Sequence, residues 1–214
     1  MKEKGHASLT EKAYHLLVQK IVALELPPGT LLTEGRLVKE LGIGRTPIRE
    51  AVQRLIAEGL ITHLHHRGML VAELRAVDVQ QVYEFRALIE GHAARLAATR
   101  MTPAQIEELT RIRDAMERAL EDADVEGFVA QDRQLHRLLG RAAQNRYLDS
   151  VLANVYNLHL RLWYYILKKE GGFQETVQEH KELIAALVRH DPDGAERAMR
   201  DYVSRLARRI KEII

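Results

Sequence analysis

The sequence predicts a mainly α-helical protein in two parts, a small head of helices and strands followed by a larger all-helical bundle. Aromatic residues make up only 5% of the 214 residues, which disfavours a β-sandwich or barrel. Up to Glu73, short helical patterns alternate with turn signals, and beyond it apolar residues recur at helical spacing to the end of the sequence. The change in pattern near residue 73 marks the boundary between the two parts.

Composition excludes several classes of protein. Hydrophobic residues are 46% and charged residues 29%, as in folded globular proteins, and the absence of cysteine excludes disulfides, thiolate metal sites and cysteine nucleophiles. No apolar run approaches the roughly 18 residues that span a bilayer, and the charged stretch Met1–His6 leads into no signal core. We therefore expect a cytoplasmic protein without a membrane partner.

The head has five predicted elements. These are helices over residues 10–24, 33–41 and 46–58, and strands over residues 60–64 and 69–72. Pro27-Pro28-Gly29 ends the first helix, Thr33 can cap the second, and Pro47 suits the first turn of the third. The polar residues 65–68 lie at the tip of the hairpin between the strands.

Two short helices joined by a glycine-containing turn and followed by a hairpin with a basic tip are typical of a winged helix-turn-helix. In such a domain the second of these helices presents its first turn to the major groove, which places Arg45, Thr46 and Arg49 near bases and phosphates. The charge of residues 1–72, 10 Lys and Arg against 7 Glu, favours nucleic acid weakly. Taken singly, each arginine could also be part of a solvated face.

The head resembles the GntR family of bacterial transcription regulators. The stretches that carry the resemblance are Pro28–Glu34, Leu41–Ala51, Glu58-Gly59-Leu60 and Arg67-Gly68. The resemblance covers residues 8–72 and implies that Arg45, Thr46 and Arg49, with the wing residues His66, Arg67 and Gly68, contact DNA. We place this DNA-binding domain at residues 8–73.

Two positions of the head depart from the family pattern. Gly44 stands where the family usually has serine or threonine, which removes a hydroxyl that could cap the helix, at a cost of a few tenths of a kcal/mol. Gly35 stands where some members have a basic residue, and the neighbouring Arg36 can substitute for that phosphate contact. We expect lower affinity and the same class of function.

The second part predicts about six helices, which form one domain at residues 78–212. The ranges are 78–100, 103–122, 125–142, 146–169, 173–190 and 192–212. Asp78, Thr102-Pro103 and Asp191-Pro192 are capping signals at three of the starts, and Gly171-Gly172 separates two helices. Short connections between amphipathic helices predict a bundle.

Two of these helices carry ionisable residues on their apolar stripes. Asp132 and His136 are one turn apart on the helix over 125–142, and His180 is at the centre of the stripe on the helix over 173–190. Because an unpaired buried carboxylate is costly, Asp132 needs a cation or a metal as partner. The three side chains could bind zinc or nickel, or form a hydrogen-bonded Asp–His pair with a separate core histidine.

The bundle resembles, more loosely, the FCD effector domain. The stretches that carry the resemblance are Val82–Glu90, Asp132-x-x-x-His136, Glu179–Ala186 and Asp193–Met199. The resemblance implies a metal on Asp132, His136 and His180, and a third histidine where this sequence has Tyr202. His159, on another inward stripe, could replace that ligand or orient an anionic effector.

Arg86 and Glu90 lie one turn apart in the first of these stretches. They could be an ordinary surface ion pair. The resemblance implies instead that Arg86 faces the interior and pairs with a ligand carboxylate, with Glu90, His159 and Tyr202 also in the effector site.

These patterns together predict a transcription regulator, expected to be a repressor, that binds a palindromic DNA operator as a homodimer. A small organic acid, held by the metal or by His159 and Tyr202 together with Arg86, would control its DNA affinity. The alternative is a metal-dependent hydrolase on the bundle, but the sequence holds no H-E-x-x-H, G-x-S-x-G or P-loop motif. We therefore expect no enzyme.

Overall fold

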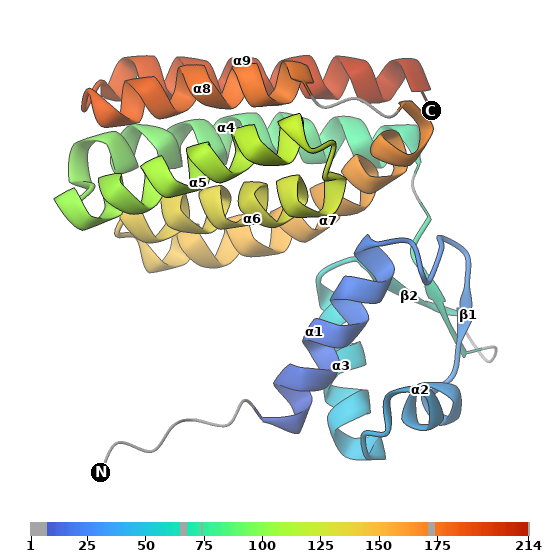
Figure 1. The fold of residues 1–214 in the computed structure, drawn as a ribbon. Coiled ribbons are helices and arrows are strands. Elements are labelled where there is room, and N and C mark those ends of the chain that lie inside the picture. The colour runs from blue at the N-terminus through green and yellow to red at the C-terminus, as the bar shows by residue number, and fades with distance from the viewer. Residues whose placement is uncertain (1–7, 65–67, 74, 171–173, 214) are drawn as a thin grey trace, which may run out of the picture. The chain divides into compact units, whose positions relative to one another are not determined.

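The computed structural model describes residues 8–64, 68–73, 75–170 and 174–213 (Figure 1). The chain divides into two compact units. One takes in Met1–Leu74 with Leu160–Tyr165, and the other Arg75–His159 with Ile166–Ile214. Among the described residues, the part of the first unit before residue 75 contains three helices and a small sheet, and Leu160–Tyr165 is a segment of a later helix. The second unit is built from helices, as the sequence predicts.

The first unit is a winged helix-turn-helix. Its elements are α1 (Leu9–Val22), β1 (Leu31–Leu32), α2 (Glu34–Leu41), α3 (Arg45–Ala57), β2 (Ile61–Leu64) and β3 (Gly68–Val71). The sheet is antiparallel with strand order β1-β3-β2, and Ile61 is opposite Val71. Helix α1 packs on α3 through fully buried residues such as Leu17, Ile48 and Leu55.

The short strand β1 is absent from the sequence prediction. It has only two residues, too few for an alternating pattern, and it is held by pairing with β3. Just before it, the backbone N–H of Gly29 donates to the carbonyl of Val71 at 2.9 Å, and the N–H of Val71 donates to Thr30 at 3.0 Å. Contacts distant in sequence therefore create this strand.

The turn between α2 and α3 follows local rules. Gly42 ends α2 with a φ of 65°, a left-handed conformation that glycine adopts at little cost. Thr33 caps the start of α2 by accepting a hydrogen bond from the N–H of Arg36 at 3.3 Å. Gly44 precedes α3 and supplies no side-chain cap, so the first N–H groups of α3 have no capping side chain at that position.

The second unit stacks its helices in three layers (Figure 1). The elements are α4 (Ala76–Arg100), α5 (Pro103–Glu121), α6 (Val125–Ala142), α7 (Arg146–Glu170), α8 (Gln174–Val188) and α9 (Pro192–Ile213). Helices α8 and α9 lie side by side, α4 and α5 form the middle layer, and α6 with the first part of α7 forms the third. Among the described residues, no helix is long and apolar enough to cross a membrane.

Two of the three predicted helix starts are confirmed and one is wrong. Thr102 forms a complete capping box with Gln105, and the carboxylate of Asp191 accepts a hydrogen bond from the N–H of Gly194 at 2.8 Å. Asp78, however, is not the N-cap of α4, because the helix begins at Ala76. Asp78 lies in the first turn, where a negative charge is favourable, and pairs with Arg75.

The predicted inward stripes of α6, α8 and α9 are buried where the structure describes their side chains, whereas Leu152, on the predicted stripe of α7, is only half-buried. On α6, Phe128 and Leu135 are fully buried and enclose Asp132. The stripe on α9, which includes Met199 and Tyr202, is buried in the same way. Ionisable and polar side chains that reach this core have little access to water, so each needs a partner within the protein.

Candidate metal and effector site, and candidate DNA-binding surface

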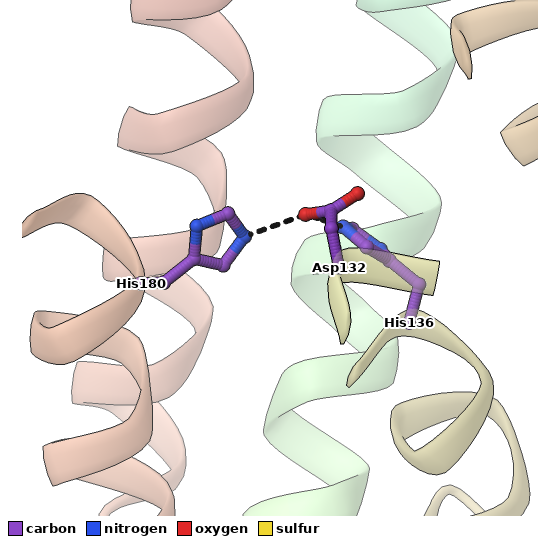
Figure 2. Close-up of side chains that lie close together, drawn as sticks. All are labelled: Asp132, His136 and His180. Atoms are coloured by element: carbon purple, nitrogen blue, oxygen red, sulfur yellow. Dashed lines mark ion pairs between the residues drawn. The ribbon is translucent and has the colours of Figure 1, made fainter. Parts of the chain in front are cut away.

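Three potential metal ligands meet inside the second unit. Asp132 and His136 come from α6 and His180 comes from α8 (Figure 2). The Oδ1 atom of Asp132 lies 3.1 Å from Nε2 of His180 and 3.7 Å from Nε2 of His136, and the three ligand atoms lie within 4.8 Å of one another. Although all three atoms are buried, none of them has a hydrogen-bond partner among the described residues. Such convergent, unsatisfied ligand atoms are what a metal site requires.

The opposite sides of two of these groups, His180 and Asp132, are held by neighbouring residues. Nδ1 of His180 lies 2.7 Å from the carbonyl oxygen of Thr176, which can only accept, so Nδ1 carries the proton and Nε2 presents its lone pair. Tyr156 donates its hydroxyl to Oδ2 of Asp132 at 2.5 Å, which leaves Oδ1 for the centre of the cluster. Partners of this kind orient metal ligands in proteins.

The donor set fits a divalent metal. Zinc binds histidine nitrogen and carboxylate oxygen at about 2.0–2.2 Å, which separates tetrahedral ligands by about 3.3–3.5 Å. The two separations that involve Asp132, 3.1 Å and 3.7 Å, lie on either side of this range, and all three ligand atoms lie within 4.8 Å of one another. Two imidazoles and one carboxylate, with no cysteine in the chain, suit zinc or nickel and leave coordination positions open.

Electrostatics keep the cluster ready to bind a cation. Burial alone would raise the pKa of Asp132, but His136 and His180 beside it outweigh burial and hold this pKa well below its usual value. Burial lowers the pKa of His136, although Glu90 and Asp132 partly oppose the effect. At neutral pH the site therefore holds a carboxylate and a neutral imidazole, the forms that bind metals.

Arg86 and Glu90 form a buried ion pair beside the cluster. The side chain of Arg86 is 0% exposed and that of Glu90 is 4% exposed, so the alternative of an ordinary surface pair is wrong. Arg86 donates through Nε to Oε1 of Glu90 at 2.5 Å and through Nη2 to Oε2 at 3.1 Å, while Nη1 has no hydrogen-bond partner among the described residues. Burial would lower the pKa of Arg86, but the charge of Glu90 outweighs it and raises this pKa.

Glu90 also reaches the metal-ligand cluster. Its Oε2 atom lies 3.3 Å from Nδ1 of His136, on the side of the imidazole ring away from Asp132. One carboxylate therefore faces both the guanidinium of Arg86 and a potential metal ligand. A proton on Nδ1 of His136 would face Glu90 in this geometry, which would leave Nε2 for the metal.

His159 and Tyr202 are both buried near this cluster but differ in their geometry. Nδ1 of His159 lies 2.6 Å from the hydroxyl of Tyr83, and His159 is not among the residues whose ligand atoms lie together. Its proposed role as a replacement metal ligand gains no support. The ring of Tyr202 lies 4.7 Å from that of His180, and its hydroxyl has no hydrogen-bond partner among the described residues. Burial raises the pKa of Tyr202 well above its usual value, so its phenol stays neutral and can donate a hydrogen bond.

The sequence interpretation missed three residues of this site. Tyr156, Tyr83 and Thr176 each hold a buried ligand or histidine through a hydrogen bond. A signal for Tyr156 existed, because it adjoins Val155 on the inward stripe of α7 that also carries His159. No pattern in the sequence indicated that it pairs with Asp132.

The predicted DNA-contacting residues of α3, the helix expected to enter the major groove, are exposed. Arg45 and Thr46 form the first turn of α3, and Arg49 follows one turn later. Arg36, on α2, donates to the carbonyl of Leu31 at 3.3 Å. These side chains are accessible to a ligand at the N-terminal end of α3, where the helix dipole attracts phosphate.

The wing is described only in part. Gly68 begins β3 with a φ of 100°, while His66 and Arg67 lie outside the described residues. A side chain at Gly68 would approach the carbonyl of Leu32 at 3.2 Å, so glycine suits this position by conformation and by space.

Comparison with known proteins gives matches over both parts of the chain. Residues 9–71 match the bacterial regulatory proteins of the gntR family, and residues 81–205 match the FCD domain. A helix-turn-helix transcriptional regulator from Agrobacterium vitis, encoded in a ttuE–ttuC' intergenic region, is 34% identical over 136 residues, which cover 62% of this chain and 80% of that protein. A protein from Paenarthrobacter nicotinovorans, described as a probable D-xylose utilization operon transcriptional repressor, is 28% identical over 95% of this chain and 89% of its own. The solved structure of McbR/YncC from Escherichia coli has the same fold, with a TM-score of 0.87 at 20% identity over 97% of this chain and 99% of that one.

Proposed function

The chain belongs to the GntR family of bacterial regulatory proteins and carries an FCD domain, and on that premise we propose that it is a transcriptional repressor controlled by a small carboxylate. The carboxylate would bind on a divalent metal held by Asp132, His136 and His180. One observation carries this proposal: the three buried ligand atoms of these residues converge and have no hydrogen-bond partner among the described residues. The P. nicotinovorans relative, which is described as a probable repressor, supports repression rather than activation.

Two hydrogen-bond donors of the chain suit the carboxylate of the effector. Nη1 of Arg86 and the hydroxyl of Tyr202 are buried and have no hydrogen-bond partner among the described residues, and both interact electrostatically with the cluster or its neighbours. Zinc or nickel bound there would supply Lewis-acid attraction for a carboxylate oxygen. Arg86 would neutralise the ligand's negative charge, Tyr202 would donate a neutral hydrogen bond, and Glu90 would hold Arg86 in place. His159 would help to orient the ligand through Tyr83.

The head would read DNA through its exposed basic residues. We assign contacts to Arg36, Arg45, Thr46 and Arg49 and to the wing residues His66, Arg67 and Gly68, within a DNA-binding domain at residues 8–73. The exposure of the recognition-helix side chains and the positive end of α3 support this assignment.

A homodimer would place two such heads on a palindromic operator. Helix α4, part of an effector domain at residues 78–212, carries three exposed apolar side chains, Val77, Phe85 and Leu88. At 3.6 residues per turn they fall within about 80° of one another on the helix, opposite the buried side that carries Arg86. An apolar stripe of this kind supports contact with a second copy.

We infer that the metal serves binding rather than hydrolysis. A three-ligand zinc site with open positions also occurs in hydrolases. Here, however, the relatives are transcription regulators, and the site adjoins two buried donors suited to holding an anion. Ligand control requires only that the acid bind two conformations of the protein unequally.

The experiment begins with a duplex that the zinc-loaded chain selects from random oligonucleotides. Fluorescence anisotropy then measures its affinity for that duplex with citrate, malate, lactate, gluconate or galactonate present. We expect at least one acid to weaken DNA binding by wild-type protein, while Asp132→Asn protein binds the duplex normally and ignores the acid. An acid that acts equally on both proteins, or a panel without any effect, would count against the proposal.

A further inference from the structure

Glu34 and Arg49 form a bidentate ion pair that links the start of α2 to the recognition helix α3. Nε of Arg49 lies 2.9 Å from Oε1 of Glu34, and Nη2 lies 2.9 Å from Oε2. These bonds occupy one edge of the guanidinium. The other edge, formed by Nη1 and the second N–H of Nη2, makes no hydrogen bond or ion pair with the part of the chain that the structure describes.

Glu34 is better fixed than the arginine it holds. It is the first residue of α2, directly after the cap Thr33, and α2 is anchored one turn later by Leu37, which is 1% exposed. A carboxylate at a helix N-terminus is favoured by the helix dipole. The side chain of Arg49, in contrast, is 63% exposed and long. The pair therefore restrains a flexible side chain against a rigid helix.

The free edge of Arg49 has the geometry for reading guanine. Two parallel N–H groups of one guanidinium edge bind O6 and N7 of guanine in the major groove. We propose that Glu34 is a positioning residue for base reading, which orients Arg49 so that its free edge meets a guanine. This inference rests on the proposed DNA-binding role of Arg49.

The charge of Glu34 adds a second effect. The hydrogen bond from Arg49 lowers the pKa of Glu34, and the charge of Arg45 acts in the same direction, so the carboxylate is ionised at neutral pH. A negative charge at this surface repels phosphates of any sequence. Glu34 thus favours the correct duplex over other DNA through the orientation of Arg49, while its charge lowers the affinity for every duplex.

The test compares operator affinity with non-specific affinity at one salt concentration. Full-length wild-type, Glu34→Ala, Glu34→Gln, Arg49→Ala and Glu34→Ala/Arg49→Ala proteins are titrated with the duplex selected by the wild type and with a scrambled duplex. Glu25→Gln is the matched control, because it removes one negative charge from an exposed glutamate whose ion pair, within the described part of the chain, is with Lys20. Circular dichroism verifies that each variant is folded.

We expect the ratio of operator to scrambled affinity to fall about five- to tenfold in Glu34→Ala, and less in Glu34→Gln, which keeps one acceptor oxygen. Scrambled binding should rise about twofold. Glu25→Gln should leave the ratio unchanged, and Glu34→Ala should lower it no further in an Arg49→Ala background.

Three outcomes would overturn the inference. The first is a ratio of operator to scrambled affinity that is unchanged in Glu34→Ala, and the second is a ratio that rises because Glu34 holds Arg49 away from DNA. The third is a ratio that Glu34→Ala lowers equally in the wild-type and the Arg49→Ala background. A wild-type chain that selects no duplex at all would instead overturn the proposed function, so the two failures are distinguishable.

Discussion

Replacing Arg86 by methionine would leave the carboxylate of Glu90 buried without its cation. Glu90 is 3% exposed and Arg86 is 0% exposed, so little water can solvate the remaining charge. Removing one partner of a buried ion pair costs about 3–5 kcal/mol, whereas a pair at the surface is worth at most about 1 kcal/mol. We expect Arg86→Met to lower the free energy of unfolding by about 3 kcal/mol or more.

A double-mutant cycle separates the ion pair from the packing of the long side chain. In Arg86→Met/Glu90→Gln the buried charge is gone, so the double variant should recover about 2 kcal/mol relative to Arg86→Met alone. Urea denaturation of metal-free protein, followed by circular dichroism, measures the free energy of unfolding of the wild type, of Arg86→Met, of Glu90→Gln and of the double variant. Arg95→Met is the matched control on the same helix, because Arg95 is 41% exposed and pairs with Glu196 at 3.3 Å.

The control should cost less than about 1 kcal/mol. The reasoning would be refuted if Arg86→Met were no more costly than Arg95→Met. Strict additivity of the Arg86 and Glu90 changes would refute it equally, because the two groups would then not depend on each other.

Three further predictions concern the same buried site. Tyr156→Phe removes the hydrogen bond to Asp132 and should weaken zinc binding about tenfold in a chelator competition, and unchanged affinity would show that Tyr156 does not orient the ligand. Tyr202→His adds an imidazole beside His180 and should tighten zinc binding about tenfold or more, whereas weaker binding would contradict the placement of Tyr202 at the site. The pKa values of His136 and His159 are lowered in the folded protein, so the unfolded chain takes up protons first as the pH falls below about 6.5. The free energy of unfolding of metal-free protein should therefore be highest above about pH 6.5. Below that pH, each of these histidines should lower it by about 1.4 kcal/mol per pH unit. If His159→Gln left the slope of unfolding free energy against pH unchanged, the lowered pKa of His159 would be contradicted.

The helices and the inward stripes could be predicted because helical spacing and capping are local properties. Asp132 and His136 are one turn apart on a single helix, so their proximity follows from the sequence. The arrival of His180 at 3.1 Å from Asp132 depends on how α8 packs in the bundle, which only the resemblance to a known domain indicated.

Pairings between distant segments could not be predicted. The two-residue strand β1 exists only through β3, and the bond from Tyr156 to Asp132 joins residues 24 positions apart. The ion pair of Glu34 with Arg49 joins two helices across the turn of the head. In each case both residues look ordinary in the sequence, and tertiary packing alone decides which partner they meet.

Zinc binding by the full chain is the most direct test of the cluster on which control by a carboxylate depends. In competition with a chromophoric chelator, wild-type protein should bind about one zinc ion, and Asp132→Ala and His180→Ala should each weaken binding about a hundredfold or more. His159→Gln should change the affinity much less. Zinc affinity that is the same in wild-type, Asp132→Ala and His180→Ala proteins would contradict the metal site.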